Sequence, residues 1–189
     1  MNTQKLLTLI IASVTLSTTV PAQEATPNAA ASATPPVMAA SPVFVATNAV
    51  VTAPLVVTND YLVLTGDQAE LTVGGKAVFN FTVTNAGKYE IATVINAPDE
   101  SSNSFFVNID AAPQDPDMIW DVEVTHGFEP RLANWRGGGT DSADEFAPKV
   151  FTLTAGAHQL IIVGREPGAE LKSWYLKPAP VTAPAPTSP

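Results

Sequence analysis

Short runs in which apolar and polar residues alternate are the clearest pattern in this chain. Phe79, Phe81 and Val83 recur at every second position, and the run breaks at Ala86-Gly87 before a second apolar run begins. The same order returns over residues 151–164, where an Ala-Gly pair again separates two alternating runs. A period of two is typical of half-buried β-strands, and no window shows the apolar stripe of an amphipathic helix. The pattern therefore predicts an all-β fold.

Gly, Pro, Asn and Asp residues divide the chain into many short runs, which is typical of β-sandwiches and barrels. We predict one antiparallel two-sheet sandwich, in which Trp120 and Trp174 lie on strands and pack in the core. Residues 43–52 are interpreted either as a marginal strand or as part of a linker. The predicted strands are 55–58, 61–64, 69–73, 77–84, 88–96, 104–110, 118–124, 131–136, 149–154, 158–164 and 171–176.

The segments outside the predicted sandwich differ from it in composition. Residues 1–22 hold one lysine, an apolar core over Leu6–Leu16 and the small-residue ending Val20-Pro21-Ala22. This pattern predicts a secretory signal peptide. The apolar core is too short for a membrane anchor, which needs roughly 20 apolar residues. Tracts rich in Ala, Thr and Pro on both sides of the sandwich predict linkers or disordered tails. The predicted organisation is a signal peptide over 1–22, a linker over 23–54, a sandwich over 55–178 and a disordered tail over 179–189. We expect a protein secreted to the extracellular space or the periplasm.

Composition excludes several classes of function. The chain has no cysteine, which excludes disulfides, thiolate catalysis and cysteine-based zinc sites. Its net charge is −9 without a basic stripe, which argues against nucleic acid and against anionic membranes as partners. Solubility outside the cell is the simpler explanation of this charge.

Motifs for catalysis are absent from the sequence. It contains no nucleophile elbow, no Gly-rich phosphate loop and no His-x-x-x-His pair, so we expect neither an enzyme nor a cofactor. Asp121 and Glu123 alternate on a predicted strand and would share a face. Two such carboxylates keep a small glycan hydrolase as a minor alternative.

Several short motifs follow one another in a recognisable order. They are Lys88 to Ile91, Asp99 to Asp110, Trp135, Phe151 to His158, and Arg165 to Ala169. This order resembles the carbohydrate-binding modules of families 6 and 35, over roughly residues 77–176. The resemblance implies a galactose-binding-like jelly roll that binds a polysaccharide or another glycan without catalysis, beside a glycan-degrading enzyme or at a cell surface. A structural or adhesive surface domain without a sugar site is the alternative.

The resemblance also implies a structural calcium ion, held by an acidic residue near the domain start and an aspartate in the last strand. Asp60 and Asp67 lie near the start of the predicted sandwich, but the matching position in the last strand is Lys172. Calcium needs oxygen ligands, and an ammonium group supplies none. We therefore expect no metal at this site.

A sugar site needs an aromatic side chain for the C–H face of the ring and polar groups for the hydroxyls. Residues 127–139 supply both within a short stretch that ends in three glycines. An aromatic side chain here would stack on the ring, and arginines could also pair with a uronate carboxylate. Burial of Trp135 in the core is the alternative for that residue. The candidate carbohydrate-binding residues are Phe128, Arg131, Asn134, Trp135, Arg136 and, from the resemblance, Asp110.

Overall fold

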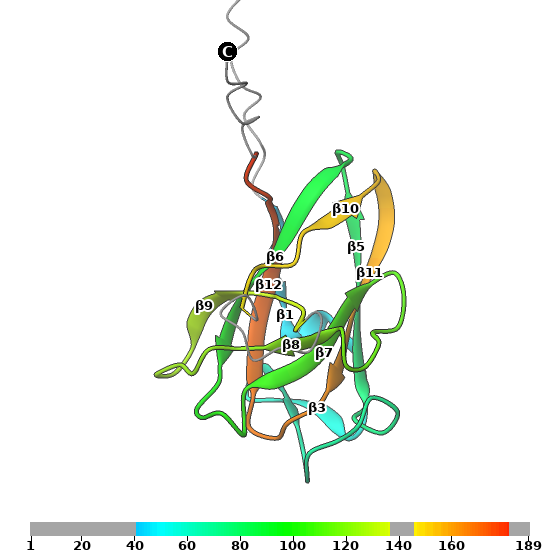
Figure 1. Cartoon of the computed structure of the whole chain (residues 1–189). Helices are drawn as coiled ribbons and strands as arrows, with labels where there is room; N and C mark the ends of the chain where they lie inside the picture. Colours follow the sequence, from blue (N-terminus) through cyan, green and yellow to red (C-terminus); the bar gives the residue numbers. More distant parts are fainter. Residues whose placement is uncertain (1–40, 137–145, 182–189) are drawn as a thin grey trace, which may run out of the picture. The chain divides into compact units, whose positions relative to one another are not determined.

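The computed structural model describes residues 41–136 and 146–181, and this part of the chain is built of β-strands (Figure 1). The only helical element among these residues is a short 3-10 turn, η1, over Ala46–Asn48. The strands are β1 (Phe44–Val45), β2 (Val50–Thr52), β3 (Leu55–Thr58), β4 (Tyr61–Leu64), β5 (Lys76–Val83), β6 (Gly87–Asn96), β7 (Ser104–Ile109), β8 (Ile119–Asp121), β9 (Glu129–Leu132), β10 (Phe151–Leu153), β11 (Gly156–Gly164) and β12 (Glu170–Pro178).

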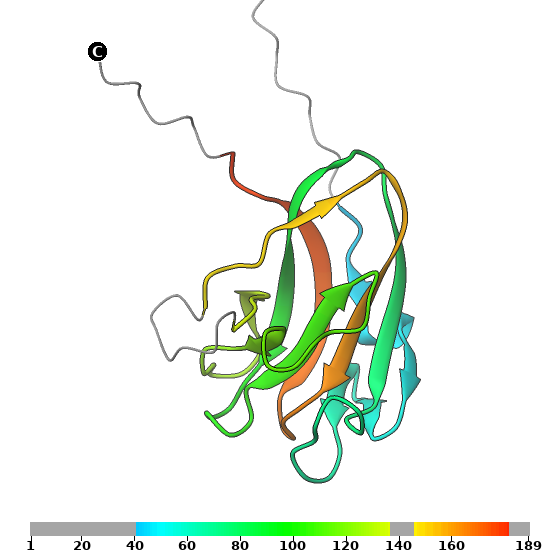
Figure 2. The same cartoon turned by 45° about the vertical axis from the view of Figure 1, so that its right-hand side comes forward.

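The strands form two antiparallel sheets. The first sheet has the order β10-β6-β12-β4-β3, with β1 paired to β12 and β9 paired to β6. The second sheet has the order β2-β5-β11-β7-β8. Figure 2 shows the two sheets as layers that face each other. The predicted all-β, antiparallel two-sheet sandwich is confirmed.

Aromatic side chains from both sheets fill the core. Trp174 is completely buried, with the ring of Phe44 stacked on its indole at 4.5 Å. The rings of Phe79 and Phe81 meet the same indole edge-on, at 5.5 and 5.3 Å. Aromatic pairs prefer offset-stacked and edge-to-face geometries to a perfect face-to-face arrangement. The predicted core positions of Trp120 and Trp174 are both confirmed.

The sandwich begins before residue 55. Strand β1 pairs with β12, opposite Trp174, and β2 pairs with β5. These strands lie in residues assigned to the linker or to a marginal strand in the sequence analysis. They are too short to show a period of two, but each is stabilised by backbone hydrogen bonds to a long strand that is distant in sequence. The predicted signal peptide and most of the predicted linker lie outside the described residues.

One predicted strand, 69–73, is absent from the structure, and the strands predicted at 118–124 and 131–136 end early, at Asp121 and Leu132. Residues 69–73 are not a strand, because the N–H groups of Val73 and Gly74 both donate to the carbonyl of Glu70 and close a turn. Leu71 instead packs on a small apolar cluster of Phe106, Ile119 and Val163. This cluster lies on the opposite face of the second sheet from the main core, because Phe106 alternates with the core residue Phe105. The strand expected at 131–136 is β9, which ends at Leu132.

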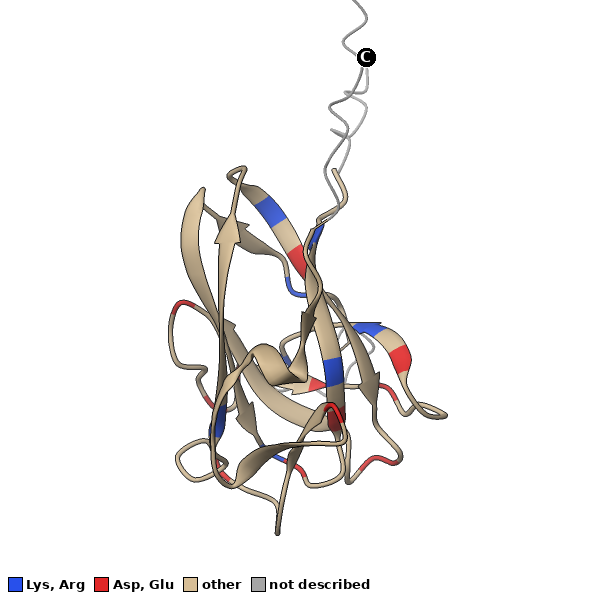
Figure 3. Cartoon of the chain, turned by 180° about the vertical axis from the view of Figure 1, so that it is seen from behind, with Lys and Arg blue, Asp and Glu red and all other residues tan. Residues whose placement is uncertain are grey.

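Charged residues are few along the strands. Figure 3 shows Lys, Arg, Asp and Glu mainly on loops and at isolated strand positions. Acidic residues outnumber basic ones by 18 to 9 in the whole chain. Among the residues with a described structure, no helix is long and apolar enough to cross a membrane.

Candidate functional site

A hollow lies over three neighbouring strands of the first sheet, β12, β6 and β9. Tyr175, Ala92 and Leu132 are register partners across these strands, so their side chains share one face of the sheet. That face is the outer one, because the neighbours Trp174 and Leu176 of Tyr175 are buried in the core. A small residue between two large ones leaves a depression along β6.

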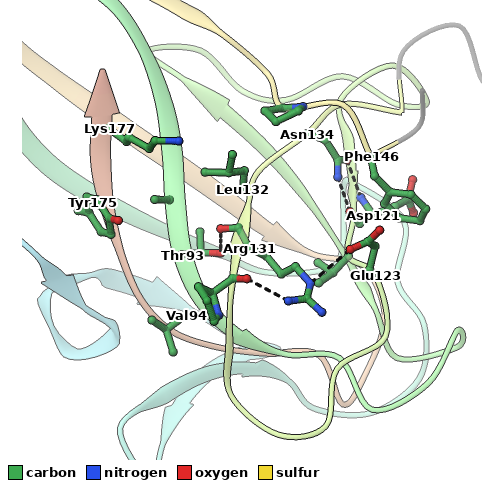
Figure 4. Close-up of a pocket in the computed structure, with 14 residues that line it drawn as sticks. Thr93, Val94, Asp121, Glu123, Arg131, Leu132, Asn134, Phe146, Tyr175 and Lys177 are labelled. Carbon is green, nitrogen blue, oxygen red and sulfur yellow. Dashed lines mark hydrogen bonds and ion pairs between the residues drawn. The ribbon is translucent and has the colours of Figure 1, made fainter. Parts of the chain in front are cut away.

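The hollow extends past the edge of the sheet and has a volume of about 620 Å³. Figure 4 shows its residues, with Tyr175 and Lys177 at one side and Phe146, Asp121 and Glu123 at the other. Its lining consists of Ala92, Thr93, Val94, Asp121, Val122, Glu123, Pro130, Arg131, Leu132, Asn134, Phe146, Pro148, Tyr175 and Lys177.

Two exposed aromatic side chains line this hollow. Tyr175 and Phe146 are each 39% exposed. Exposed aromatic rings in a concave, mostly apolar surface are typical of ligand sites, in which a few polar groups fix the orientation. The hollow can therefore present a flat apolar group to a ligand at each of two positions.

Ion pairs hold the charged side chains of the hollow in place. The Arg131 guanidinium lies 2.9 Å from Glu129 Oε2 and 3.7 Å from Glu123 Oε2. The pKa of Glu129 is lowered, first because its carboxylate accepts the backbone N–H of His126 and then because of Arg131. Lys177 Nζ lies 3.2 Å from Glu90 Oε2. Figure 4 shows Arg131 pointing toward Glu123.

Asn134 lines the hollow, but its carboxamide is used inside the protein. The residue is only 2% exposed. Its Oδ1 accepts the N–H of Asp121 at 3.1 Å, and its Nδ2 donates to the Asp121 carbonyl at 2.5 Å. The N–H of Arg136 donates to the Ile119 carbonyl. Residues 134–136 thus pair with the edge of β8 as a further strand would. In this pairing the side-chain amide of Asn134 takes the place of a backbone peptide group.

Trp135 and Arg136 also bind within the sandwich. The indole N–H of Trp135 donates to the Val107 carbonyl at 2.8 Å, and Lys149 Nζ lies 3.7 Å from the ring centroid. Arg136 binds both oxygens of Asp121, at 2.7 and 2.6 Å. Asp121 is buried, so this bidentate pair fixes the end of β8. Neither side chain lines the hollow.

Phe128 and Asp110 lie at two other places on the surface. The ring of Phe128 is 5.7 Å from that of Tyr61 and 5.1 Å from Lys172 Nζ. Asp110 accepts a hydrogen bond from the ring of His158, with Nδ1 and Oδ2 2.6 Å apart. This contact raises the pKa of His158, and the carbonyl of Thr154 at Nε2 adds to the effect.

Of the six candidates from the sequence, the structure therefore brings only Arg131 and Asn134 to the hollow. Tyr175 and Phe146 are not among the residues predicted from the sequence. The alternation around Trp174 and Leu176 could have placed Tyr175 on the outer face. No sequence pattern singles out Phe146.

The position implied for calcium holds an ion pair instead. Lys172 Nζ lies 3.2 Å from Asp60 Oδ2, and both side chains are largely exposed. An ammonium group occupies the place where a cation would need a carboxylate, so these residues do not fit calcium. Elsewhere in residues 41–136 and 146–181, no group of three or more His, Asp or Glu is placed to hold a metal.

Comparison with known proteins gives structural matches only. No family model and no curated protein matches the sequence. The native structure of a family 35 carbohydrate binding module from Clostridium thermocellum has a TM-score of 0.52 at 12% identity, and the match covers 75% of this chain and 100% of the module. A second structure of a family 35 module from that organism has a TM-score of 0.50 at 12% identity, with 71% and 97% covered.

A match to a larger protein covers only part of it. For a GH26-CBM35 β-(1,4)-mannanase from Podospora anserina, the TM-score is 0.49 at 14% identity, with 75% of this chain covered. This chain spans only 28% of the mannanase chain. At 12% identity, the similarity to the two modules shows the fold alone, and it confirms the predicted jelly-roll sandwich. It does not distinguish family 6 from family 35.

Proposed function

We propose that this protein is a secreted, non-catalytic carbohydrate-binding protein that binds a polysaccharide at the hollow over β12, β6 and β9. One observation carries the proposal, which is that Tyr175 and Phe146 are both exposed in the same hollow as Glu123 and Lys177. The aromatic rings suit the C–H faces of sugar rings, and the charged groups suit the hydroxyls.

The structural neighbours and the sequence support this proposal. The two modules with the same fold are themselves described as carbohydrate binding modules. The signal-peptide pattern of residues 1–22 supports secretion. A glycan-degrading enzyme or a cell surface is the proposed neighbour of the module.

Two alternatives predict different behaviour. A structural or adhesive sandwich without a sugar site is favoured by one observation, which is that Asn134, Trp135 and Arg136 all bind within the protein. A glycan hydrolase that uses Asp121 and Glu123 is less well supported, because both oxygens of Asp121 accept hydrogen bonds from Arg136.

Calorimetric titration of the purified protein with a panel of soluble polysaccharides tests the proposal. We expect dissociation constants of about micromolar to millimolar for at least one glycan. Tyr175→Ala and Phe146→Ala should each weaken binding about fivefold, since one stacked aromatic contact contributes roughly 1 kcal/mol.

Phe128→Ala is a matched control, because Phe128 is 38% exposed but lies outside the hollow. Loss of binding in Phe128→Ala alone would move the site to residues 127–139, as the sequence predicts. No binding to any glycan would favour the structural domain. Products released from a glycan would favour the hydrolase.

A further inference from the structure

The cations around the hollow are already paired with carboxylates of the protein. Arg131 pairs with Glu129 and Glu123, Lys177 pairs with Glu90, and Arg136 pairs with Asp121. These lining groups and their ion-pair partners comprise three cations, Arg131, Arg136 and Lys177, and four carboxylates, Glu90, Asp121, Glu123 and Glu129. An anionic ligand would therefore enter a region with an excess of carboxylates, on a chain whose net charge is −9.

This arrangement changes what the arginines can do. From the sequence, Arg131 and Arg136 are expected to bind sugar hydroxyls or a uronate carboxylate, because a guanidinium matches a carboxylate in two bonds. In the structure, that bidentate geometry is used for Asp121, and Arg131 faces two glutamates. A uronate would have to displace a carboxylate of the protein and leave it unpaired, which costs binding energy.

Glu123 differs from the other carboxylates of this group. Its side chain is 61% exposed, whereas those of Glu90 and Asp121 are buried. Its contact with Arg131 is long, at 3.7 Å between Oε2 and Nε, so its oxygens can still accept hydrogen bonds. It lines the same hollow as Phe146, and Figure 4 draws both at the same side of that hollow.

We propose that Glu123 is a specificity-determining residue, which accepts a hydroxyl of a neutral sugar and repels an anionic one. The proposal rests on the proposed function of the hollow. The Glu123 carboxylate lies 3.7 Å from Arg131 Nε at the wall of the hollow. A sugar ring stacked on an aromatic residue of the hollow can donate its hydroxyls to this carboxylate. The protein thereby selects neutral glycans over uronic-acid glycans of the same linkage.

The test uses matched pairs of oligosaccharides that differ only at C6. Gluco-, galacto- and manno-oligosaccharides are titrated beside the oligomers of the corresponding uronic acids, at low and at high salt. Wild-type protein should bind at least one neutral member, and bind its uronate counterpart several-fold more weakly. Glu123→Gln should reduce the ratio of neutral to uronate affinity about two- to fivefold, which is the factor expected for one exposed charge pair. Added salt should reduce the same ratio in the wild-type protein, because salt screens the repulsion.

Glu100→Gln is the control, because it removes one exposed carboxylate in a loop that does not line the hollow. A uronate bound as tightly as its neutral partner would overturn this inference and leave the proposed function standing. The inference would also be overturned if Glu123→Gln and Glu100→Gln changed the ratio of neutral to uronate affinity equally. Wild-type protein that binds none of the six oligosaccharides would overturn this inference, whereas only the absence of binding to every glycan of the polysaccharide panel would overturn the proposed function as well.

Discussion

Replacing Asn134 with alanine separates a structural role of this residue from a role in ligand binding. In the structure, its carboxamide binds both backbone groups of Asp121 along the edge of β8, and the residue is almost completely buried. Asn134→Ala removes both hydrogen bonds without adding bulk. We expect a large loss of stability and, for molecules that remain folded, little change in glycan affinity.

The size of the effect follows from the two groups left without a partner. A buried backbone group that loses its hydrogen bond costs about 1–3 kcal/mol. In the variant, water can enter the space left by the carboxamide, so we expect values in the lower half of this range and about 2–4 kcal/mol in total. For a domain of this size, that corresponds to a fall in melting temperature of roughly 10 °C.

Urea unfolding followed by tryptophan fluorescence measures the change in free energy of unfolding. The slope of the transition should stay constant while its midpoint falls. Asn80→Ala is the control, because the side chain of Asn80 makes one exposed hydrogen bond to Gln159. That variant should differ from wild type by less than about 0.5 kcal/mol.

Either of two results would contradict a structural role for Asn134. If Asn134→Ala unfolds at the wild-type urea concentration but loses glycan binding, the carboxamide serves a ligand and not the edge of β8. If Asn134→Ala and Asn80→Ala lower the free energy of unfolding equally, the two hydrogen bonds to Asp121 contribute no more than one exposed hydrogen bond.

Three further predictions concern pH, calcium and the start of the domain. Because the pKa of His158 is raised in the folded state, its contribution to stability is complete below the ordinary pKa of 6.5 and is lost as pH rises through the folded value. Thermal melts across this pH range should show the loss in wild type and a smaller loss in Asp110→Asn, in which only the Thr154 carbonyl still raises the pKa. Melts with calcium and with chelator should coincide, because Lys172 pairs with Asp60 where a cation would bind; a calcium-dependent rise in melting temperature would contradict this. Phe44→Ala should cost about 2 kcal/mol in urea unfolding, because the half-buried ring stacks on the core indole; an unchanged midpoint would exclude β1 from the cooperative unit.

Long strands could be predicted from the sequence because their signal is local. The alternating run of residues 77–84 corresponds to β5 at Lys76–Val83, and that of 158–164 to β11 at Gly156–Gly164. Each strand of this length shows its buried face by itself, since every second side chain must be apolar. The burial of Trp174 follows from the same rule.

Short strands could not be predicted with the same success, because their partners lie far away in sequence. Residues 69–73 are as apolar as Val50–Thr52, but only β2 finds a neighbouring strand to pair with. Leu71 is covered by packing against the outer face of the second sheet instead. Apolar composition indicates that a segment is covered, and not which element covers it.

The candidate site shows the same difference between features that depend on local sequence and features that depend on distant partners. The sequence by itself determined the all-β class, the faces of the long strands and the acidic character of the chain, because each depends on residue type and spacing along the chain. Only the tertiary structure decided that Asn134 and Arg136 bind Asp121, and that Tyr175 and Phe146 share a hollow. Hydrogen-bonding groups are satisfied by whichever partner the fold brings within reach, so the use of a polar side chain depends on the pairing of distant strands.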